Sequence, residues 1–244
     1  MERDSLSVIV PAFNEERYIG TTLDAINNAI SHAQMSKSIS VEVVVVDNGS
    51  TDETAAIARA KGARVVVACQ HNVATARNAG ADAALGDLLV FVDADTHWSI
   101  GILTRILDVM QNESCVGGAV ATAYHPKRLV LRFYLEFWRI IGRLCGMAQG
   151  ATQFCTAQAF ARVRGYNEAV FMGEDVEFHW KLRRLSKAVN GFVFTIEDEK
   201  VVPSCRKFDS WPVWKTLLLT NPLTCLLLSR CKSPWREWYS EPIR

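Results

Sequence analysis

Short apolar runs alternate with helical patterns along the first half of the chain. The apolar runs are typical of buried parallel strands and span residues 6–10, 41–46, 64–68 and 88–92. The helical patterns between them span residues 14–30, 50–61 and 75–85. Because strands that alternate with helices pair in parallel through right-handed crossovers, this order predicts an α/β fold with a Rossmann-like, doubly wound, mainly parallel sheet.

Local signals predict where these helices begin and end. Asn14 is a typical N-cap for the first helix, and Ser50 with Glu53 has the spacing of a capping box for the second. Gly62 is expected as the C′ residue of the second helix, and Gly86 as the stop of the third.

The regular alternation fades in the second half of the chain. We expect a helix over residues 100–110, a strand over residues 116–123, and helical patterns at residues 129–144 and 176–185. The sequence therefore predicts one compact domain over residues 1–207, with a smaller irregular region, and a C-terminal helical appendage over residues 208–244.

The composition narrows the class of protein. With 244 residues, 49% of them hydrophobic and 22% charged, the chain has the composition of a folded globular protein. A net charge of +1 gives no case for nucleic-acid binding. The basic residues gather from Lys200 onward, where eight Lys or Arg face three Asp or Glu.

The cysteines indicate a reducing compartment. There are seven, and none forms a Cys-x-x-Cys pair, which argues against a disulfide framework and a zinc site. The first residues are polar and lack the apolar core of a signal peptide. No apolar run reaches the ~20 residues of a membrane span. We therefore expect a cytoplasmic protein.

Two carboxylates, Asp93 and Asp95, follow the fourth apolar run. Ligands of open α/β sheets bind beyond the carboxyl ends of the strands. Oxygen ligands there suit a hard divalent cation, Mg²⁺ or Mn²⁺, that carries a phosphate. The alternative is a strand that ends in a simple turn, because Asp is common in turns. The pair by itself leaves both interpretations open.

Three further polar clusters lie near the ends of predicted elements, at residues 11–16, 47–52 and 173–175. Each cluster alone is explained by turn or cap chemistry, which is the interpretation we give to Glu16 and Asp52. Four such clusters in one chain favour a functional site.

The order and spacing of these motifs resemble family 2 of the glycosyltransferases, which have the GT-A nucleotide-sugar fold. The resemblance covers residues 5 to 207 and rests on residues 7–15, 44–52, 76–80, 91–95 and 173–175. It implies a nucleotide-diphospho-sugar donor, a divalent metal, and transfer with inversion at the sugar carbon. The domain then divides into a nucleotide-sugar half, about residues 1–98, and an acceptor half, about residues 99–207.

The resemblance implies roles at the reacting centre. Asp175 is the general base that removes the acceptor proton, and Glu174 positions the acceptor or the base. Mn²⁺ or Mg²⁺ bridges the two phosphates, with Asp95 as the expected direct ligand and Asp93 acting through the ribose or a bound water. Adjacent carboxylates raise one another's pKa, which suits a base near neutral pH. By themselves, Glu174 and Asp175 would indicate only an acidic pair at a helix N-terminus.

The resemblance also implies the residues around the nucleotide. Asp47 resembles the nucleobase contact and would accept the N3–H of uracil, which favours a UDP-sugar, although guanine also offers N–H donors. The remaining nucleotide-binding residues are Pro11, Phe13 and Glu15 for the base and ribose, and Arg77, Arg206 and Lys207 for the phosphates. The alternatives are an exposed helix arginine at residue 77 and a basic loop at residues 206–207.

The chain departs from the processive members of the family. Those members carry Gln-x-x-Arg-Trp after the base, whereas residues 179–184 here are His-Trp-Lys-Leu-Arg-Arg. This difference argues against a polymer synthase and for one sugar per encounter. His179 is more typical of a structural helix residue than of a ligand.

Residues 129–144 predict an amphipathic helix with a broad apolar face. A polar stripe is formed by Arg132, Glu136, Arg139 and Arg143. We favour a core-packed helix. The alternative is an interfacial helix that helps the enzyme reach a lipid-linked acceptor at the inner face of a membrane. The basic tail and the tryptophans at residues 211, 214, 235 and 238 agree with this alternative, or with a dimer surface.

The sequence therefore predicts a metal-dependent, inverting, nonprocessive glycosyltransferase. One alternative is a degenerate family member that serves as a peripheral membrane or partner-binding module, against which Asp93, Asp95 and Asp175 speak. A weaker alternative is a sugar-nucleotide pyrophosphorylase, which should carry a glycine-rich basic loop where residues 11–15 are acidic and lack glycine. The donor sugar, the acceptor and the oligomeric state stay open; a lipid-linked compound and a glycan are both compatible acceptors.

Overall fold

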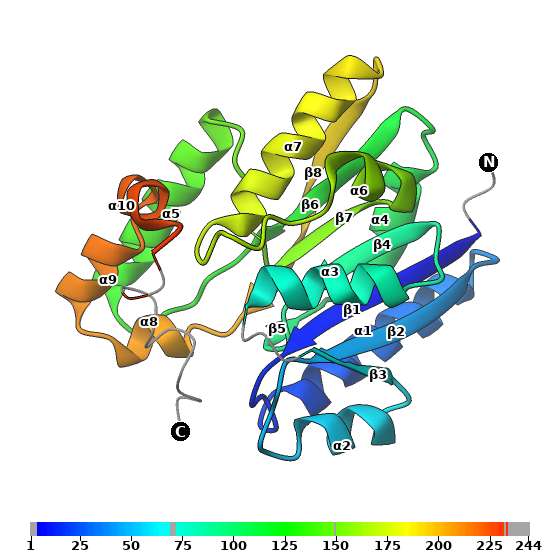
Figure 1. Ribbon diagram of the computed structural model, residues 1–244, viewed down its shortest axis with the longest axis horizontal. Helices are drawn as coiled ribbons and strands as arrows, with labels where there is room; N and C mark the ends of the chain where they lie inside the picture. Colours follow the sequence, from blue (N-terminus) through cyan, green and yellow to red (C-terminus); the bar gives the residue numbers. More distant parts are fainter. Residues whose placement is uncertain (1–3, 69–71, 149, 232, 234–244) are drawn as a thin grey trace.

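A computed structural model describes residues 4–68, 72–148, 150–231 and 233 (Figure 1). The strands within these residues are β1 (Ser5–Ala12), β2 (Ser40–Asp47), β3 (Arg64–Val67), β4 (Leu88–Val92), β5 (Thr96–His97), β6 (Cys115–Thr122), β7 (Thr152–Thr156) and β8 (Phe192–Pro203). The helices are α1 (Ile19–Gln34), α2 (Thr54–Ala60), α3 (Val73–Ala83), α4 (Ile102–Met110), α5 (Leu129–Leu144), α6 (Ala157–Val163), α7 (Glu174–Ala188), α8 (Arg206–Ser210), α9 (Val213–Leu219) and α10 (Pro222–Leu228).

One sheet organises these elements, with its strands in the order β3-β2-β1-β4-β7-β6-β8-β5. The first four strands pair in parallel, as the apolar runs predict. Their carboxyl ends therefore meet at one edge of the sheet, where the polar residues that follow β1, β2 and β4 come together. The expected doubly wound, mainly parallel half of the fold is confirmed.

The second half of the sheet is mixed. Strand β7 runs antiparallel to both β4 and β6, and β8 runs parallel to β6. The sequence analysis missed β5, β7 and β8. Strand β7 reads Thr-Gln-Phe-Cys-Thr, which has no apolar run, yet its first four residues are buried between two neighbouring strands. Strand β8 carries exposed charges at Glu197, Asp198 and Lys200, which hide its period in the sequence.

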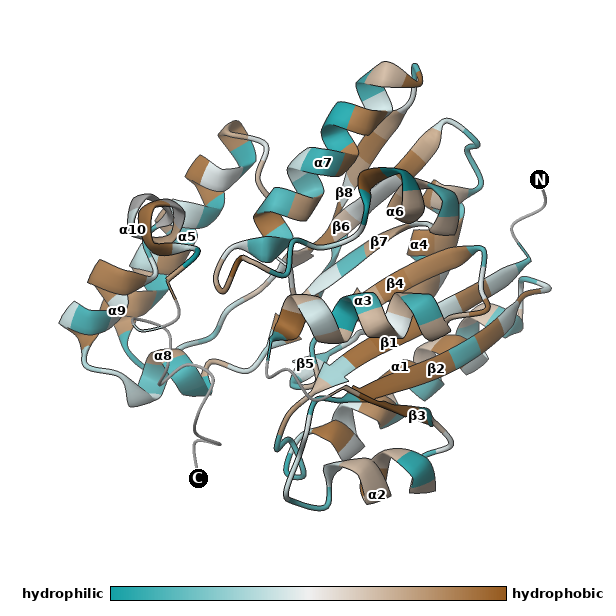
Figure 2. Cartoon of the chain, in the orientation of Figure 1, coloured by the Kyte–Doolittle hydropathy of each residue, from teal (hydrophilic) through white to brown (hydrophobic). Residues whose placement is uncertain are grey.

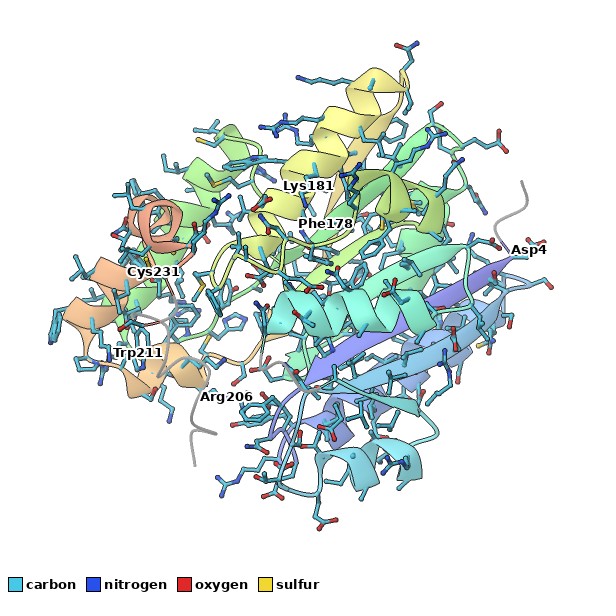
Figure 3. All side chains as sticks on the ribbon, in the orientation of Figure 1. Asp4, Phe178, Lys181, Arg206, Trp211 and Cys231 are labelled. Atoms are coloured by element: carbon cyan, nitrogen blue, oxygen red, sulfur yellow. The ribbon has the colours of Figure 1, made fainter. Side chains whose placement is uncertain are left out.

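Helices cover both faces of the sheet (Figure 1). Helices α1 and α4 pack on one face, around a core that includes Val8, Leu23 and Ile102. Helices α3, α6 and α7 cover the other face, where the ring of Phe91 of β4 contacts Tyr166 and Phe178 edge to face. Phe178, on α7, is labelled in Figure 3. The sheet is thus a rigid support for the loops at its carboxyl edge.

Two predicted helix starts are wrong. Helix α1 begins at Ile19, because Asn14 adopts a left-handed φ of 54° and its side chain accepts a hydrogen bond from Thr51 N–H at 2.8 Å. Helix α2 begins at Thr54, because the Ser50 hydroxyl instead accepts from Asn14 N–H at 3.0 Å. The two loops therefore bind each other. Gly62 does end α2 with a left-handed φ of 83°.

The last three described helices, α8 to α10, lie at one side of the sheet next to α5 (Figure 1). The expected boundary at residue 207 falls inside α8, and the division into domains stays a prediction. Trp211 is buried and Trp214 is exposed, whereas residues 235 and 238 lie outside the described residues, as does Cys69. None of the six described cysteines forms a disulfide with another of them.

The core-packed interpretation of residues 129–144 is wrong for most of the helix. Only Leu131 and Leu135 of α5 are buried, and Phe133 is 76% exposed. Over the described part of the chain, no helix combines the length and the apolar character that crossing a membrane requires.

Candidate active site

A cavity of about 260 Å³ lies at the carboxyl edge of the sheet; we call it the carboxylate pocket. It gathers all the site residues expected from the sequence except Asp47: Pro11, Phe13, Glu15, Arg77, Asp93, Asp95, Glu174, Asp175, Arg206 and Lys207. These residues come from the ends of β1 and β4, from α3, and from the starts of α7 and α8. The fold therefore brings together residues separated by up to about two hundred positions.

Backbone hydrogen bonds hold the loop that follows β4. Asp93 N–H donates to the carbonyl of Ala151 at 3.2 Å, and Thr96 N–H donates to the carbonyl of Asp93 at 3.0 Å. The carbonyl of Asp95 accepts from Ser204 N–H at 3.0 Å. This last bond brings the start of α8 against the two aspartates.

Arg206 lies among acidic side chains between α8 and the end of β1 (Figure 3). It forms an ion pair with Glu15, and its Nη2 lies 3.3 Å from Oδ2 of Asp95. Burial raises the pKa of Asp95 to about 6; the neighbouring Glu15 and Asp93 add to this effect, and Arg206 opposes it. Burial also raises the pKa of Glu15, although Arg206 opposes it. Carboxylate groups therefore outnumber the basic side chains that could neutralise them in the pocket.

Arg77 is a buried bridge beneath the pocket, not an exposed helix arginine. Its side chain is 3% exposed, and it donates to Asp93 at 2.7 Å and to Glu174 at 2.8 Å. Its guanidinium group also lies over the Tyr166 ring, with the Cζ atom 5.1 Å from the ring centroid. Arg77 thus orients two of the expected site carboxylates.

Glu174 and Asp175 form the first turn of α7, after Gly173 at a left-handed φ of 83°. Asp175 accepts a hydrogen bond from Val176 N–H at 2.8 Å. A Cβ on Gly150 would lie 2.6 Å from Oδ2 of Asp175, so the backbone of Gly150 holds the carboxyl closely. Burial raises the pKa of both acids, while Arg77 and backbone N–H groups oppose the rise. A raised pKa makes a carboxylate a better proton acceptor.

Asp47 is not in the set of residues that line the pocket. Its Oδ1 accepts a hydrogen bond from Ser50 N–H at 2.9 Å and so closes the turn that follows β2. The next residue, Asn48, does line the pocket. The role of Asp47 as a nucleobase contact stays a prediction.

Sequence reasoning missed several lining residues, notably Asn48, Tyr124 and Gly150. Asn48 belongs to the polar cluster at residues 47–52, so its position after β2 is a signal that could have found it. Burial raises the pKa of Tyr124, and the nearby Asp175 and Asp93 add to the rise. Nothing in the sequence around Tyr124 or Gly150 predicts that either residue lies next to Asp175.

The residues fit a divalent cation. Asp95 and Asp93 are hard oxygen donors in a pocket with excess carboxylate, and Glu15 Oε2 is buried without a hydrogen-bond partner. Among the described residues there is no group of three His, Cys, Asp or Glu side chains that could hold a metal alone. Two carboxylates are the usual protein share of a Mg²⁺ or Mn²⁺ site that is completed by substrate phosphates.

Comparison with known sequences gives a family. The sequence model of glycosyl transferase family 2 matches residues 7–166. A similar curated protein is the 4,4'-diaponeurosporenoate glycosyltransferase of Staphylococcus aureus, which is 37% identical over 140 residues; these are 54% of this chain and 34% of that protein. The chain spans 34% to 44% of the length of the curated relatives that it matches first.

Comparison with solved structures gives the fold. The mannosyltransferase PcManGT from Pyrobaculum calidifontis, in complex with GDP-Man and Mn²⁺, has a TM-score of 0.69 at 20% identity, over 98% of this chain and 66% of that one. Glucosyl-3-phosphoglycerate synthase from Mycobacterium tuberculosis, in complex with Mn²⁺ and UDP, has a TM-score of 0.60 at 20% identity, over 93% and 80%. The expected GT-A fold is confirmed.

Proposed function

Because the chain belongs to glycosyl transferase family 2, we propose that it transfers a sugar from a nucleotide-diphosphate donor to a hydroxyl group of an acceptor. Transfer proceeds with inversion at the sugar carbon and adds one sugar per encounter. The observation that carries the proposal is the meeting of Asp93, Asp95 and Asp175 in one pocket, with Arg206 beside Asp95.

The reaction is a single in-line displacement. A lone pair of the acceptor oxygen forms the new bond to the anomeric carbon, and the bond from that carbon to the diphosphate oxygen breaks. The electron pair of that bond leaves with the nucleoside diphosphate. The acceptor proton passes to the carboxylate of Asp175, whose orientation is set by Gly150 and Val176. Glu174, held by Arg77, is a positioning residue.

Asp95 and Asp93 are the residues that would hold a divalent metal. When bound, Mn²⁺ or Mg²⁺ neutralises charge on the diphosphate and so makes it a better leaving group. Arg206, beside Asp95, and Lys207 also line the pocket, where they would contact the phosphates. Arg206 would then exchange part of its contact with Glu15 and Asp95 for the donor.

We propose a UDP-sugar as the donor. The support is the resemblance at Asp47, which ends β2 next to the pocket residue Asn48. The solved structures of similar fold hold GDP-Man in one case and UDP in another, so the fold is compatible with either nucleotide. No observation favours a pyrophosphorylase or a degenerate binding module.

A thermal-shift panel of UDP-, GDP- and dTDP-sugars with and without Mn²⁺ tests the donor. A ligand at 100 times its Kd adds about 2.7 kcal/mol of stability, so the correct series should give a clear, metal-dependent shift. Donor turnover tests the base. Asp175→Asn should lower turnover by about 10²-fold or more, which is the usual contribution of general base catalysis. Turnover that survives this substitution would refute the assignment of Asp175.

A further inference from the structure

A second cavity of about 680 Å³ adjoins the carboxylate pocket. Both cavities are lined by Tyr124, Met172, Gly173, Asp175 and Phe208. The carboxyl group that we propose as the base therefore faces the donor on one side and this larger space on the other. A ligand that fills the second cavity would end next to Asp175.

The second cavity is walled by two helices and floored by the sheet. Helix α5 contributes Leu135 and Trp138, the segment after it contributes Met147, α7 contributes Trp180, and β8 contributes Val193. Its volume lies within the range of small-molecule sites, and its large apolar walls suit a hydrocarbon chain. Charged side chains also line it, among them Arg139, Arg183 and Glu177, so the second cavity suits an amphiphile with an apolar chain and a polar head.

A buried histidine, His179, also lines the second cavity. His179 follows Asp175 by one turn on the same face of α7, is 4% exposed and lines the cavity. Its Nδ1 is buried without a hydrogen-bond partner. Burial and the nearby Arg183 lower its pKa to about 4, so the ring is neutral at neutral pH. A neutral imidazole can hydrogen-bond an uncharged polar group of a ligand head.

The outer side of α5 is apolar as well. Its exposed residues Val130, Phe133, Phe137, Ile140 and Leu144 follow each other at intervals of three or four positions and form one stripe. At 3.6 residues per turn, this outer stripe lies opposite the face that lines the second cavity. Figure 2 shows hydrophobic segments in α5, α9 and α10. Leu218 of α9 is also exposed. Helix α5 therefore presents apolar side chains on two faces, one toward the second cavity and one toward the outside.

We propose that the second cavity is the acceptor site and that it holds the apolar chain of an amphiphilic alcohol, whose hydroxyl group reaches Asp175. This inference rests on the proposed function, because it names the acceptor class for the same base. The shared boundary at Asp175, the apolar walls and the unpaired nitrogen of His179 each support it.

Calorimetric titration of the full chain with n-octyl, n-nonyl and n-decyl β-glucosides below their micelle concentrations tests the site. If the chain enters the second cavity, each added methylene should tighten binding by about fourfold, the equivalent of ~0.8 kcal/mol per buried CH₂. Micelles are avoided so that the dispersed amphiphile alone is measured.

Gly142→Phe is the blocking variant. Gly142 lines the second cavity, and a Cβ there would meet only Met147 Cβ at an ordinary 3.7 Å. Replacing a helix glycine does not strain the helix, so a thermal melt should show a folded protein. We expect alkyl-glucoside binding to weaken by about tenfold or more. The matched control is Ile140→Phe, which adds the same ring on the outer stripe and should leave binding unchanged.

Three outcomes would overturn the proposal. One is a wild-type protein that binds nucleotide but shows no dependence on alkyl chain length; the proposed function would then stand without this acceptor site. Another is binding that is lost in Ile140→Asp but kept in Gly142→Phe, which would place the amphiphile on the outer stripe. The last is alkyl-glucoside binding that tightens with chain length in a protein that binds no nucleotide. The second cavity would then be a lipid site without an acceptor role.

Discussion

Arg77 and Glu174 form an ion pair of 2.8 Å whose side chains are only 3% and 10% exposed. The two residues come from α3 and α7 and are 97 positions apart. Arg77 also pairs with Asp93, so one cation links the carboxylates that follow β4 with those that begin α7. The geometry of the candidate site therefore depends on the buried charge of Arg77, which holds Asp93 and Glu174.

Arg77→Met should strongly destabilise the protein. It leaves Glu174 buried and Asp93 half-buried without their cation, and the loss of one partner of a buried pair costs about 3–5 kcal/mol. The control is Lys61→Met, which breaks an exposed pair with Asp24 and should cost about 1 kcal/mol or less. Urea denaturation measures both. Equal losses in the two variants would contradict the role of Arg77.

Gly150→Ala should disable the base without removing it. The added methyl group would lie 2.6 Å from Oδ2 of Asp175 and must displace it. A displacement of about 1 Å can cost roughly 10²-fold in rate, so turnover should fall while the nucleotide-induced thermal shift remains. Gly20→Ala is the control, because its Cβ would meet Ile57 at an ordinary 3.5 Å. Full turnover in Gly150→Ala would show that Asp175 tolerates the shift.

Activity should be lost on acidification, at a higher pH than an ordinary aspartate would give. Burial raises the pKa of Asp175, and the base works only when it is deprotonated, so turnover is lost as the pH falls through this raised value. The pH profile of kcat/KM measures this acid limb. A limb near the ordinary Asp value of about 3.9 would contradict the shift.

The contribution of Asp175 to the free energy of unfolding should change with pH in the opposite sense to its effect on activity. Because its pKa is raised in the folded state, the charged form costs stability above that pKa, and the cost disappears as the pH falls toward the unfolded value. Asp175→Asn should therefore be more stable than the wild type at neutral pH, and the difference should shrink on acidification. Denaturation at several pH values checks this, and a difference that is independent of pH would contradict it.

Asp95→Asn should weaken metal binding. Asp95 lies in the part of the pocket where Glu15 has an unpartnered oxygen and where burial raises the pKa of both acids. Removing one carboxylate should abolish the added thermal shift that Mn²⁺ gives with UDP, and a chelator should do the same in the wild type. Asp52→Asn, on the outer side of the loop that precedes α2, is the control. A Mn²⁺-dependent shift that persists in Asp95→Asn would place the metal elsewhere.

Local pattern was enough to predict the first half of the fold. The runs at β1, β2 and β4 are apolar because both faces of a parallel sheet are covered, so their composition alone identifies them. Helix starts were less predictable. Asn14 and Ser50 look like caps in the sequence, but their polar atoms bind each other's loops, which only the packed sheet brings together.

The second half shows where local pattern fails. Strand β7 is recognisable only as the partner of β4 and β6, since its residues lack an apolar run. Helix α5 has an amphipathic pattern, but that pattern does not say which apolar face would be buried. In the structure one face lines the second cavity and the other is exposed.

The sequence by itself determined that carboxylates follow parallel strands. The apolar run that ends at Asp93 and Asp95 is recognised from neighbouring residues alone, and the crossover rule then makes the strand parallel. Tertiary structure alone decided what those carboxylates contact. Arg77 meets Glu174, Gly150 meets Asp175, and Arg206 meets Glu15. Such contacts join residues that are distant in the chain, and their energies depend on burial and separation, which only the folded chain has.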